Sequence, residues 1–278
     1  MVKYEGDIWN ELNGGLGNQL FQLAMGLAFS KRFNYNLNLD LRGCDSSESK
    51  YCEFHLTPLL KYLPINKVLR YKRAKDRVTS KLYFTFQNPT QISRQESIKF
   101  YSQESVPKRI FLSHNENNFF AREANKYNFQ NIISEFRADI ARKVNIRTVE
   151  GSVYSASSLG DFVALHLRGR DFVGSQSFTP LDWYTKVSSK YFKGSRVLIF
   201  SDDIVLATRL QSRLTGSTIV KESEIPIYDL VLASFCGAHI LSSSTFSFWM
   251  SNISDSNKIF SPLPQKDIFA PIRPYYNL

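Results

Sequence analysis

The chain has 278 residues, of which 43% are hydrophobic and 14% aromatic, and its formal net charge is +10. This apolar content is enough for packed cores and excludes an intrinsically disordered chain. No stretch approaches the roughly 20 apolar residues that span a bilayer, and acidic residues stand where a signal peptide would be apolar, so we expect a cytoplasmic protein. Cys44, Cys52 and Cys236 cannot all pair and match no zinc-site spacing, which predicts reduced thiols.

Much of the positive charge lies between Lys61 and Lys81, where eight basic residues face only Asp76. Three interpretations stay open: a solvated surface, a nucleic-acid footprint, or a patch that contacts an anionic membrane. Aromatic residues are sparse here and no nucleic-acid-binding motif accompanies them, which argues against nucleic acid. Membrane attraction amounts to about 1 kcal/mol per basic residue, so peripheral contact with the inner membrane face is the more useful hypothesis if the protein acts on a lipid-linked substrate.

The first part of the chain predicts a strand, a turn, a helix and a second strand. Residues 7–12 alternate apolar and polar side chains, and residues 13–19 form a glycine-rich turn. Residues 20–33 carry apolar side chains at helical spacing, and residues 35–41 return to strand-like alternation. Residues 42–131 are less regular, and we interpret them as helices and loops added to a first domain.

The second part alternates strand and helix signals after a stretch of small residues, 151–160, that we take as the linker. Thr179 is the expected N-cap of its first helix, with Pro180 at the first helical position. Repeated β-α units imply parallel sheets covered on both faces. We therefore predict an α/β fold with two Rossmann-like domains, 1–150 and 151–278, facing across a cleft. The expected strands are 162–167, 196–200, 217–220, 238–241 and 258–260, and the expected helices are 180–192, 204–214, 225–235 and 246–253.

Polar clusters follow four of the predicted strands, at 13–19, 166–171, 201–203 and 242–245. In open α/β sheets, ligands bind beyond the carboxyl ends of the strands, so these clusters are the best candidates for a functional site.

The cluster at 166–171 reads His-Leu-Arg-Gly-Arg-Asp. Arginine presents a planar fork that suits phosphate oxygens, so Arg168 and Arg170 predict an anion site. The alternative is a surface ion-pair cluster of the two arginines with Asp171. His166 alone would be an ordinary core histidine, but its place before the arginines favours an active-site role.

The other two clusters of the second domain each have a functional and a structural interpretation. Ser201, Asp202 and Asp203 could bind a metal, contact a nucleoside or cap the next helix, and no third acidic residue nearby supports a metal. We favour nucleoside recognition by one aspartate and capping by the other. Hydroxyls and N–H groups at 242–245 predict a phosphate cradle at a helix N-terminus, with ordinary capping as the alternative.

The four clusters together resemble one known family. Residues 14–22 (GGLGNQLFQ) resemble the opening motif of the glycosyltransferase family 11 α-1,2-fucosyltransferases, and residues 166–171 (HLRGRD) resemble its HxRRGD motif. Residues 200–203 resemble its FSDD motif, and residues 236–249 are similar to its CxHxI and NSSFSWW segments. These segments occur in family order and span residues 12–252.

The resemblance implies a fold of the GT-B type, a GDP-fucose donor, no required metal, and inversion at the anomeric carbon. Arg168 would contact the β-phosphate and stabilise the departing GDP. His166 and Asp171 are the nearest proton acceptors for the attacking 2-hydroxyl. The expected acceptor is a galactose-containing glycan, free or lipid-linked, in surface polysaccharide (O-antigen) synthesis. The remaining donor-binding residues would be Gly17 and Asn18 at the sugar, Ser244, Thr245 and Phe246 at the pyrophosphate, Asp202 or Asp203 at the guanosine, and Ser201 and Arg170 beside them.

The sequence departs from the family pattern in two places. The paired arginines and glycine of the family read Arg168-Gly169-Arg170 here, so Arg170 stands where glycine is expected. Ser243 replaces the family's asparagine, and Met250 the glycine after its tryptophan pair. These changes leave two alternatives open within the class, a divergent acceptor or a different GDP-deoxysugar donor. A basic nucleic-acid-binding protein is the alternative from another class.

Overall fold

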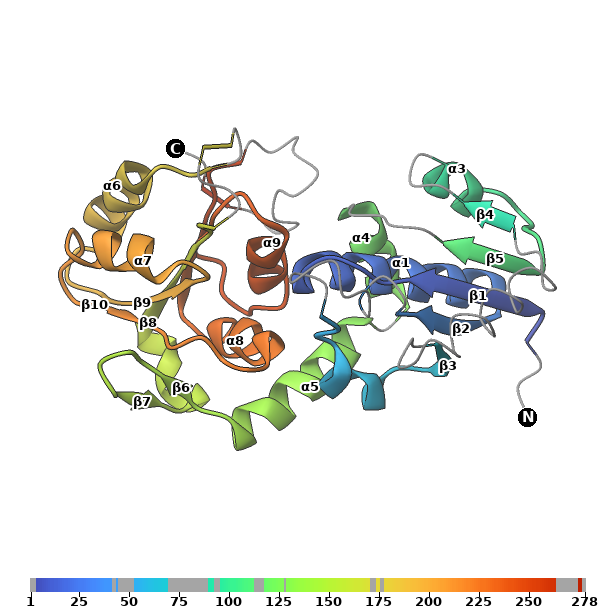
Figure 1. Cartoon of the computed structure of the whole chain (residues 1–278), viewed down its shortest axis with the longest axis horizontal. Coiled ribbons are helices and arrows are strands. Elements are labelled where there is room, and N and C mark those ends of the chain that lie inside the picture. The colour runs from blue at the N-terminus through green and yellow to red at the C-terminus, as the bar shows by residue number, and fades with distance from the viewer. Residues whose placement is uncertain are drawn as a thin grey trace. The chain divides into compact units, whose positions relative to one another are not determined.

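A computed structural model describes residues 4–41, 44, 53–69, 90–92, 96–112, 118–127, 129–170, 174–175, 178–263 and 275–276. The chain divides into two compact units, Met1–Ile132 and Ile133–Leu278, each containing a five-stranded sheet (Figure 1). The division falls within helix α5, Phe129–Lys143. The stretch expected as a linker forms strand β7, Val153–Tyr154, and the 3-10 helix η2, Ala156–Asp161.

The first unit begins with the predicted β-α-β segment, formed by β1 (Gly6–Glu11), α1 (Leu16–Phe33) and β2 (Tyr35–Asp40). Helix α1 starts four residues earlier than expected, directly after the glycine-rich turn, with Gly15 as its N-cap. Its sheet has the order β3-β2-β1-β5-β4, and all neighbouring strands are parallel.

The interpretation of residues 42–131 as helices and loops alone was wrong. Three strands from this region complete the sheet: β3 (Ile65–Leu69), β4 (Thr90–Ile92) and β5 (Arg109–Leu112). The three middle residues of β3 are exposed, and β4 has only three residues, so neither gives the buried apolar run of a central strand. Among the described residues, this region also forms the 3-10 helix η1 (Thr57–Tyr62) and helices α3 (Ser97–Tyr101) and α4 (Asn118–Lys126).

The second unit contains every strand and helix that the sequence predicts, with boundaries shifted by at most three residues. Its parallel sheet has the order β10-β9-β8-β11-β12. The strands are β8 (Phe162–Leu167), β9 (Arg196–Ser201), β10 (Ser217–Ile219), β11 (Ala238–Ile240) and β12 (Ile259–Phe260). The helices are α6 (Leu181–Tyr191), α7 (Ile204–Gln211), α8 (Pro226–Ala233) and α9 (Thr245–Asn252).

The start of α6 corrects one prediction. Pro180 is the N-cap, with an extended backbone at φ −62° and ψ 146°, and Thr179 lies outside the helix. The hydroxyl of Thr179 instead lies 3.4 Å from that of Ser243. Thr179 therefore contacts the loop that follows β11 and does not cap α6.

Strand β8 lies at the centre of this sheet, and all six of its residues are buried. Val163, Leu165 and Leu167 pack in one cluster with side chains from α6 and α7. Helices α8 and α9 lie on the other side of the sheet (Figure 1). Because side chains alternate along a strand, His166 points toward the α9 side.

Outside this sheet, a short hairpin and one buried arginine fix the start of the second unit. The hairpin of β6 (Ile146–Arg147) and β7 joins the edge of the sheet through a bridge between Thr148 and Val220. Arg137 of α5 donates to the hydroxyl of Ser234 at 3.0 Å and to the carboxylate of Asp255 at 3.0 Å. This part of α5 is therefore held to the loops that follow α8 and α9.

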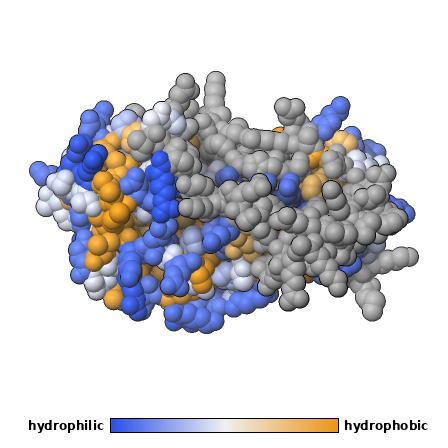
Figure 2. Space-filling view, in the orientation of Figure 1, coloured by the Kyte–Doolittle hydropathy of each residue, from blue (hydrophilic) through white to orange (hydrophobic). Residues whose placement is uncertain are grey.

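Hydrophilic and apolar residues are interspersed over the described surface that Figure 2 shows. In the parts of the chain that the structure describes, no helix combines the length and the apolar character needed to cross a bilayer.

Candidate active site

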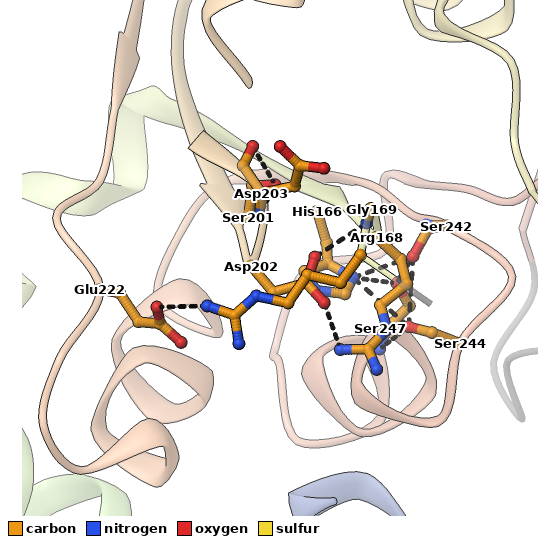
Figure 3. Close-up of polar contacts among 11 residues, drawn as sticks. His166, Arg168, Gly169, Ser201, Asp202, Asp203, Glu222, Ser242, Ser244 and Ser247 are labelled. Atoms are coloured by element: carbon orange, nitrogen blue, oxygen red, sulfur yellow. Dashed lines mark hydrogen bonds and ion pairs between the residues drawn. The ribbon is translucent and has the colours of Figure 1, made fainter. Parts of the chain in front are cut away.

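Three of the predicted clusters meet at one edge of the second sheet. Strand β8 lies between β9 and β11, and all three run parallel, so residues 166–170, 201–203 and 242–245 leave the sheet at the same edge. Figure 3 shows members of all three clusters close together, among them His166, Arg168, Asp202, Ser242 and Ser244. The fourth cluster, 13–19, lies in the first unit. Asp171 lies outside the described residues, as does most of the basic segment, residues 70–81.

Arg168 is held by a carboxylate of the neighbouring strand. Its Nη1 lies 2.5 Å from Oδ2 of Asp202, and the backbone N–H of Gly169 donates to Oδ1 of the same residue at 2.8 Å. The side chain of Arg168 is 31% exposed and that of Asp202 is 11% exposed. The arginine is therefore the more accessible member of the pair, and it can meet an anion from solvent.

Asp203 caps a helix, as expected for one of the two aspartates. It is the N-cap of α7, and its Oδ1 accepts a hydrogen bond of 3.0 Å from the N–H of Leu206. The hydroxyl of Ser201 accepts from the N–H of Asp203 at 3.0 Å and fixes the turn between strand and helix. Both aspartates are thus engaged within the protein, which weakens their assignment as nucleoside-binding residues.

The position of Gly169, where the family pattern has arginine, is explained by its close approach to Asp203. A Cβ at position 169 would overlap the Cβ of Asp203, so glycine is the residue that this crossing tolerates. Arg170 has φ +22°, in the region that favours glycine. Its Nη2 lies 3.4 Å from Oε2 of Glu222, and both side chains are about half exposed. Arg170 thus contacts the loop after β10, whereas Arg168 contacts Asp202.

His166 is the centre of a buried polar network. Its Nδ1 lies 2.7 Å from the hydroxyl of Ser247 and 2.9 Å from that of Ser242, and its ring stacks on Phe246 with centroids 4.6 Å apart. Burial, with a further contribution from Arg168, lowers the pKa of His166 to about 3. The imidazole is therefore neutral at pH 7 and is a weak proton acceptor, so its geometry favours an orienting role.

The N-terminus of α9 is organised by serine hydroxyls. Ser244 is the N-cap, and its hydroxyl accepts from the N–H of Ser247 at 3.1 Å. The hydroxyls of Ser242 and Ser247 lie within hydrogen-bond distance of Nδ1 of His166. Capping therefore accounts for Ser244, as the alternative interpretation expects, and any anion here would meet the N–H groups of the first turn, at Thr245 and Phe246.

The glycine-rich turn of the first unit is fixed by a buried glutamine that the sequence did not single out. Nε2 of Gln19 donates to the carbonyls of Gly14 at 2.8 Å and Glu53 at 2.7 Å, and its Oε1 accepts from the N–H of His55 at 3.0 Å. Gly14 has φ +70°, and the amide of Asn18 lies against it. The signal that could have identified Gln19 was a polar side chain on the buried face of α1.

Two further features concern metals and thiols. Within the described ranges, no group of three His, Cys, Asp or Glu side chains is arranged to hold a metal ion. Cys44 and Cys236 are both buried, and burial raises the pKa of the Cys236 thiol to about 12. A thiol with this pKa is protonated at neutral pH, so Cys236 is a packing residue. Cys52 lies outside the described residues.

Solved structures with a similar fold include glycosyltransferases. NodZ, a fucosyltransferase from Bradyrhizobium, matches with a TM-score of 0.53 at 12% identity and covers 91% of this chain and 93% of its own. The ADP-heptose lipopolysaccharide heptosyltransferase II of Escherichia coli matches with a TM-score of 0.52 at 10% identity, covering 98% and 90%. Together with the two parallel sheets, these neighbours show an α/β fold of the GT-B type.

Sequence comparison identifies the family. An α-1,2-colitosyltransferase of Escherichia coli is 27% identical over 270 residues, covering 86% of this chain and 84% of the relative. A sequence model of glycosyl transferase family 11 matches residues 5–267. Because this match includes every described residue of the candidate site, the chain belongs to glycosyl transferase family 11.

Proposed function

We propose that this glycosyltransferase moves fucose from GDP-fucose to the 2-hydroxyl of a galactoside, with inversion at the anomeric carbon. The observation that carries the proposal is the placement of Arg168 at the end of β8, held by Asp202 and partly exposed. The names of two similar proteins support this sugar and this linkage. A relative named an α-1,2-colitosyltransferase supports the linkage, and the structure of NodZ, an α-1,6-fucosyltransferase, soaked with GDP-fucose supports the sugar.

In the proposed reaction, the galactoside oxygen forms a bond to C1 of fucose while the bond from C1 to the β-phosphate oxygen breaks. Negative charge grows on the departing diphosphate, and the guanidinium of Arg168 would stabilise it through two parallel hydrogen bonds. The N–H groups of Thr245 and Phe246 would bind the same diphosphate at the positive end of the α9 dipole.

The hydroxyl proton passes to a base as the new bond forms. Asp171 is our proposed acceptor, since His166 is buried and its Nδ1 is already engaged by the hydroxyls of Ser242 and Ser247. His166 would instead orient the donor beside Arg168. Gly17 and Asn18 of the first unit would contact the sugar, and Arg170 and Ser201 would line the donor site. The reaction would require no metal.

We also propose the setting of the reaction. The acceptor would be a galactose-containing glycan, lipid-linked, in the synthesis of a surface polysaccharide in the cytoplasm. The basic residues between 61 and 81 would hold the enzyme at the anionic membrane. Lys61 and Lys67 are the two basic residues of this segment that the structure describes.

A different deoxysugar is the second candidate donor, because the curated relative is named a colitosyltransferase. Incubation with GDP-fucose, GDP-colitose and GDP-mannose, a panel of β-galactosides, and EDTA tests both candidates. Mass spectrometry identifies the transferred sugar, and NMR identifies the linkage and anomeric configuration. Transfer from GDP-colitose alone would replace fucose in the proposal, and the absence of both transfer and GDP binding would refute it. Salt-sensitive nucleic-acid binding that survives Arg168→Ala would favour the other class.

A further inference from the structure

The register between β8 and β9 places the two loops of the site side by side. The strands pair in parallel up to Leu167 opposite Ser201. Continuing the same register brings Arg168 opposite Asp202 and Gly169 opposite Asp203. Both pairs are in contact, one as an ion pair and the other as the close crossing that excludes a Cβ at 169.

Asp202 divides its carboxylate between these two neighbours. Oδ2 lies 2.5 Å from Nη1 of Arg168, and Oδ1 accepts the hydrogen bond of the Gly169 N–H at 2.8 Å. One side chain therefore holds both the guanidinium and the backbone to which that guanidinium is attached (Figure 3). The ion pair holds the guanidinium, and the hydrogen bond from Gly169 to an ionised carboxylate holds the backbone, so the arrangement restricts Arg168 at both ends.

The carboxylate of Asp203 is unable to replace that of Asp202 in these two contacts. Oδ1 of Asp203 accepts from the N–H of Leu206 as the N-cap of α7, and its Cβ already lies against Gly169. Asp202 itself is 11% exposed, with both oxygens directed at the 168–169 loop. Its position thus fits a support behind the arginine better than a contact with a ligand in front of it.

We infer that Asp202 is a positioning residue, which acts on the nucleotide sugar only through Arg168 and does not recognise the nucleoside. The inference rests on the proposed function, in which Arg168 contacts the diphosphate. It replaces the expectation that Asp202 reads the guanosine, and the two assignments predict different behaviour toward the base. A positioning residue affects all nucleoside diphosphates alike, whereas a base-reading residue affects only the preference for guanine.

Calorimetric binding of GDP, ADP and UDP separates the two assignments. Asp202→Asn removes the charge but keeps an oxygen for the Gly169 N–H, and it should weaken GDP binding about tenfold or more. Binding of ADP and UDP should weaken by the same factor, so the preference for GDP is retained. Loss of that preference with Asp202→Asn would overturn the inference. Asp161→Asn is the matched control, because it breaks an exposed ion pair with Arg196 at the amino ends of β8 and β9, opposite the candidate site, and should change no binding constant.

A double-mutant cycle tests the route through Arg168. In an Arg168→Ala background, Asp202→Asn should have little further effect on GDP binding, because its only route has been removed. A full tenfold effect in that background would contradict the inference. Thermal unfolding of each variant provides the control for folding.

A measurement without ligand tests the inference independently of the proposed donor. Hydrogen exchange of the Gly169 amide should accelerate about tenfold or more in Asp202→Ala, since its acceptor is lost, and remain slow in Asp202→Asn and Asp161→Asn. Unchanged exchange in Asp202→Ala would overturn the positioning role. Failure of the unmodified protein to bind GDP, with the exchange result as expected, would count against the proposed function alone.

Discussion

Nδ1 of His166 lies 2.7 Å from the hydroxyl oxygen of Ser247, and this contact joins the end of β8 to the first turn of α9. The same hydroxyl accepts the N–H of Ser242 at 2.9 Å, so its own proton is available to the imidazole. Ser247 thus ties together two of the strand ends that form the candidate site. Neither its burial nor these contacts is evident from the sequence motif that contains it.

Ser247→Ala should lower the free energy of unfolding by about 1–3 kcal/mol, because it leaves buried polar groups without their partner. It should also weaken GDP binding, since the first turn of α9 loses its connection to β8. The matched control is Ser251→Ala, whose hydroxyl donates to the carbonyl of Phe248 within the same helix at 2.8 Å. Urea unfolding and calorimetry measure both quantities, and equal effects of the two variants would contradict this role.

The pKa of His166 predicts a dependence of stability on pH. The pKa falls from the ordinary value of 6.5 to about 3 in the folded chain, through burial first and Arg168 second. Between these values the unfolded chain takes up a proton that the folded chain does not, so the free energy of unfolding falls as the pH drops below 6.5. One such group contributes a slope of up to about 1.4 kcal/mol per pH unit.

His166→Asn keeps a polar group beside Ser247 but removes the titration. Urea unfolding at several pH values between 7 and about 4.5 should therefore show a shallower slope for this variant than for the unmodified protein. Equal slopes would show that His166 does not carry the effect. Transfer activity should also show no inflection from His166 near pH 6.5, because the imidazole stays neutral there.

Arg168→Ala should reduce kcat/KM by a factor of about 1,000 or more, as expected for loss of the main charge at a departing diphosphate. Arg168→Lys keeps the charge but loses the planar fork, so it should recover only part of the activity. The fold should persist in both variants, since the side chain is 31% exposed. Steady-state kinetics with circular dichroism tests this, and turnover near that of the unmodified protein would refute the site.

Arg170→Gly should leave the free energy of unfolding within about 1 kcal/mol of the unmodified protein. Glycine relieves the positive φ of +22°, and the pair with Glu222 that is lost is exposed. The variant should weaken GDP binding less than Arg168→Ala does, because Arg170 contacts the loop after β10 and not the Asp202 side of the site. A larger loss than that of Arg168→Ala would make Arg170 the main phosphate-binding residue.

The sequence was most informative where single elements carry a strong local signal. Strand β8 is a run of six buried residues, and its motif stands at the strand end as predicted. The partners of that motif depend on the register between strands, which the local pattern of a single strand does not reveal. Arg168 and Asp202 were both expected at the site, but their pairing follows only from Leu167 lying opposite Ser201. The mostly exposed strand β3 escaped prediction for a related reason, since its place in the sheet depends on β2 and not on its own pattern.

Gly169 shows how closely the same register constrains the site. Its Cα lies so near Asp203 that a Cβ would overlap the aspartate Cβ, which is held by the cap of α7 and has little freedom to withdraw. Gly169→Ala should therefore displace the 168–170 loop and carry Arg168 away from its position. We expect transfer activity to fall by about a hundredfold or more, as for a small misplacement of a reacting group.

Gly160→Ala is the matched control for this substitution, because a Cβ there meets no atom within 4 Å and its backbone needs no positive φ. Steady-state kinetics and thermal unfolding should show full activity for Gly160→Ala and an active-site defect with a retained fold for Gly169→Ala. Full activity of Gly169→Ala would mean that the crossing with Asp203 yields without moving Arg168. The close approach would then be a packing feature with no part in catalysis.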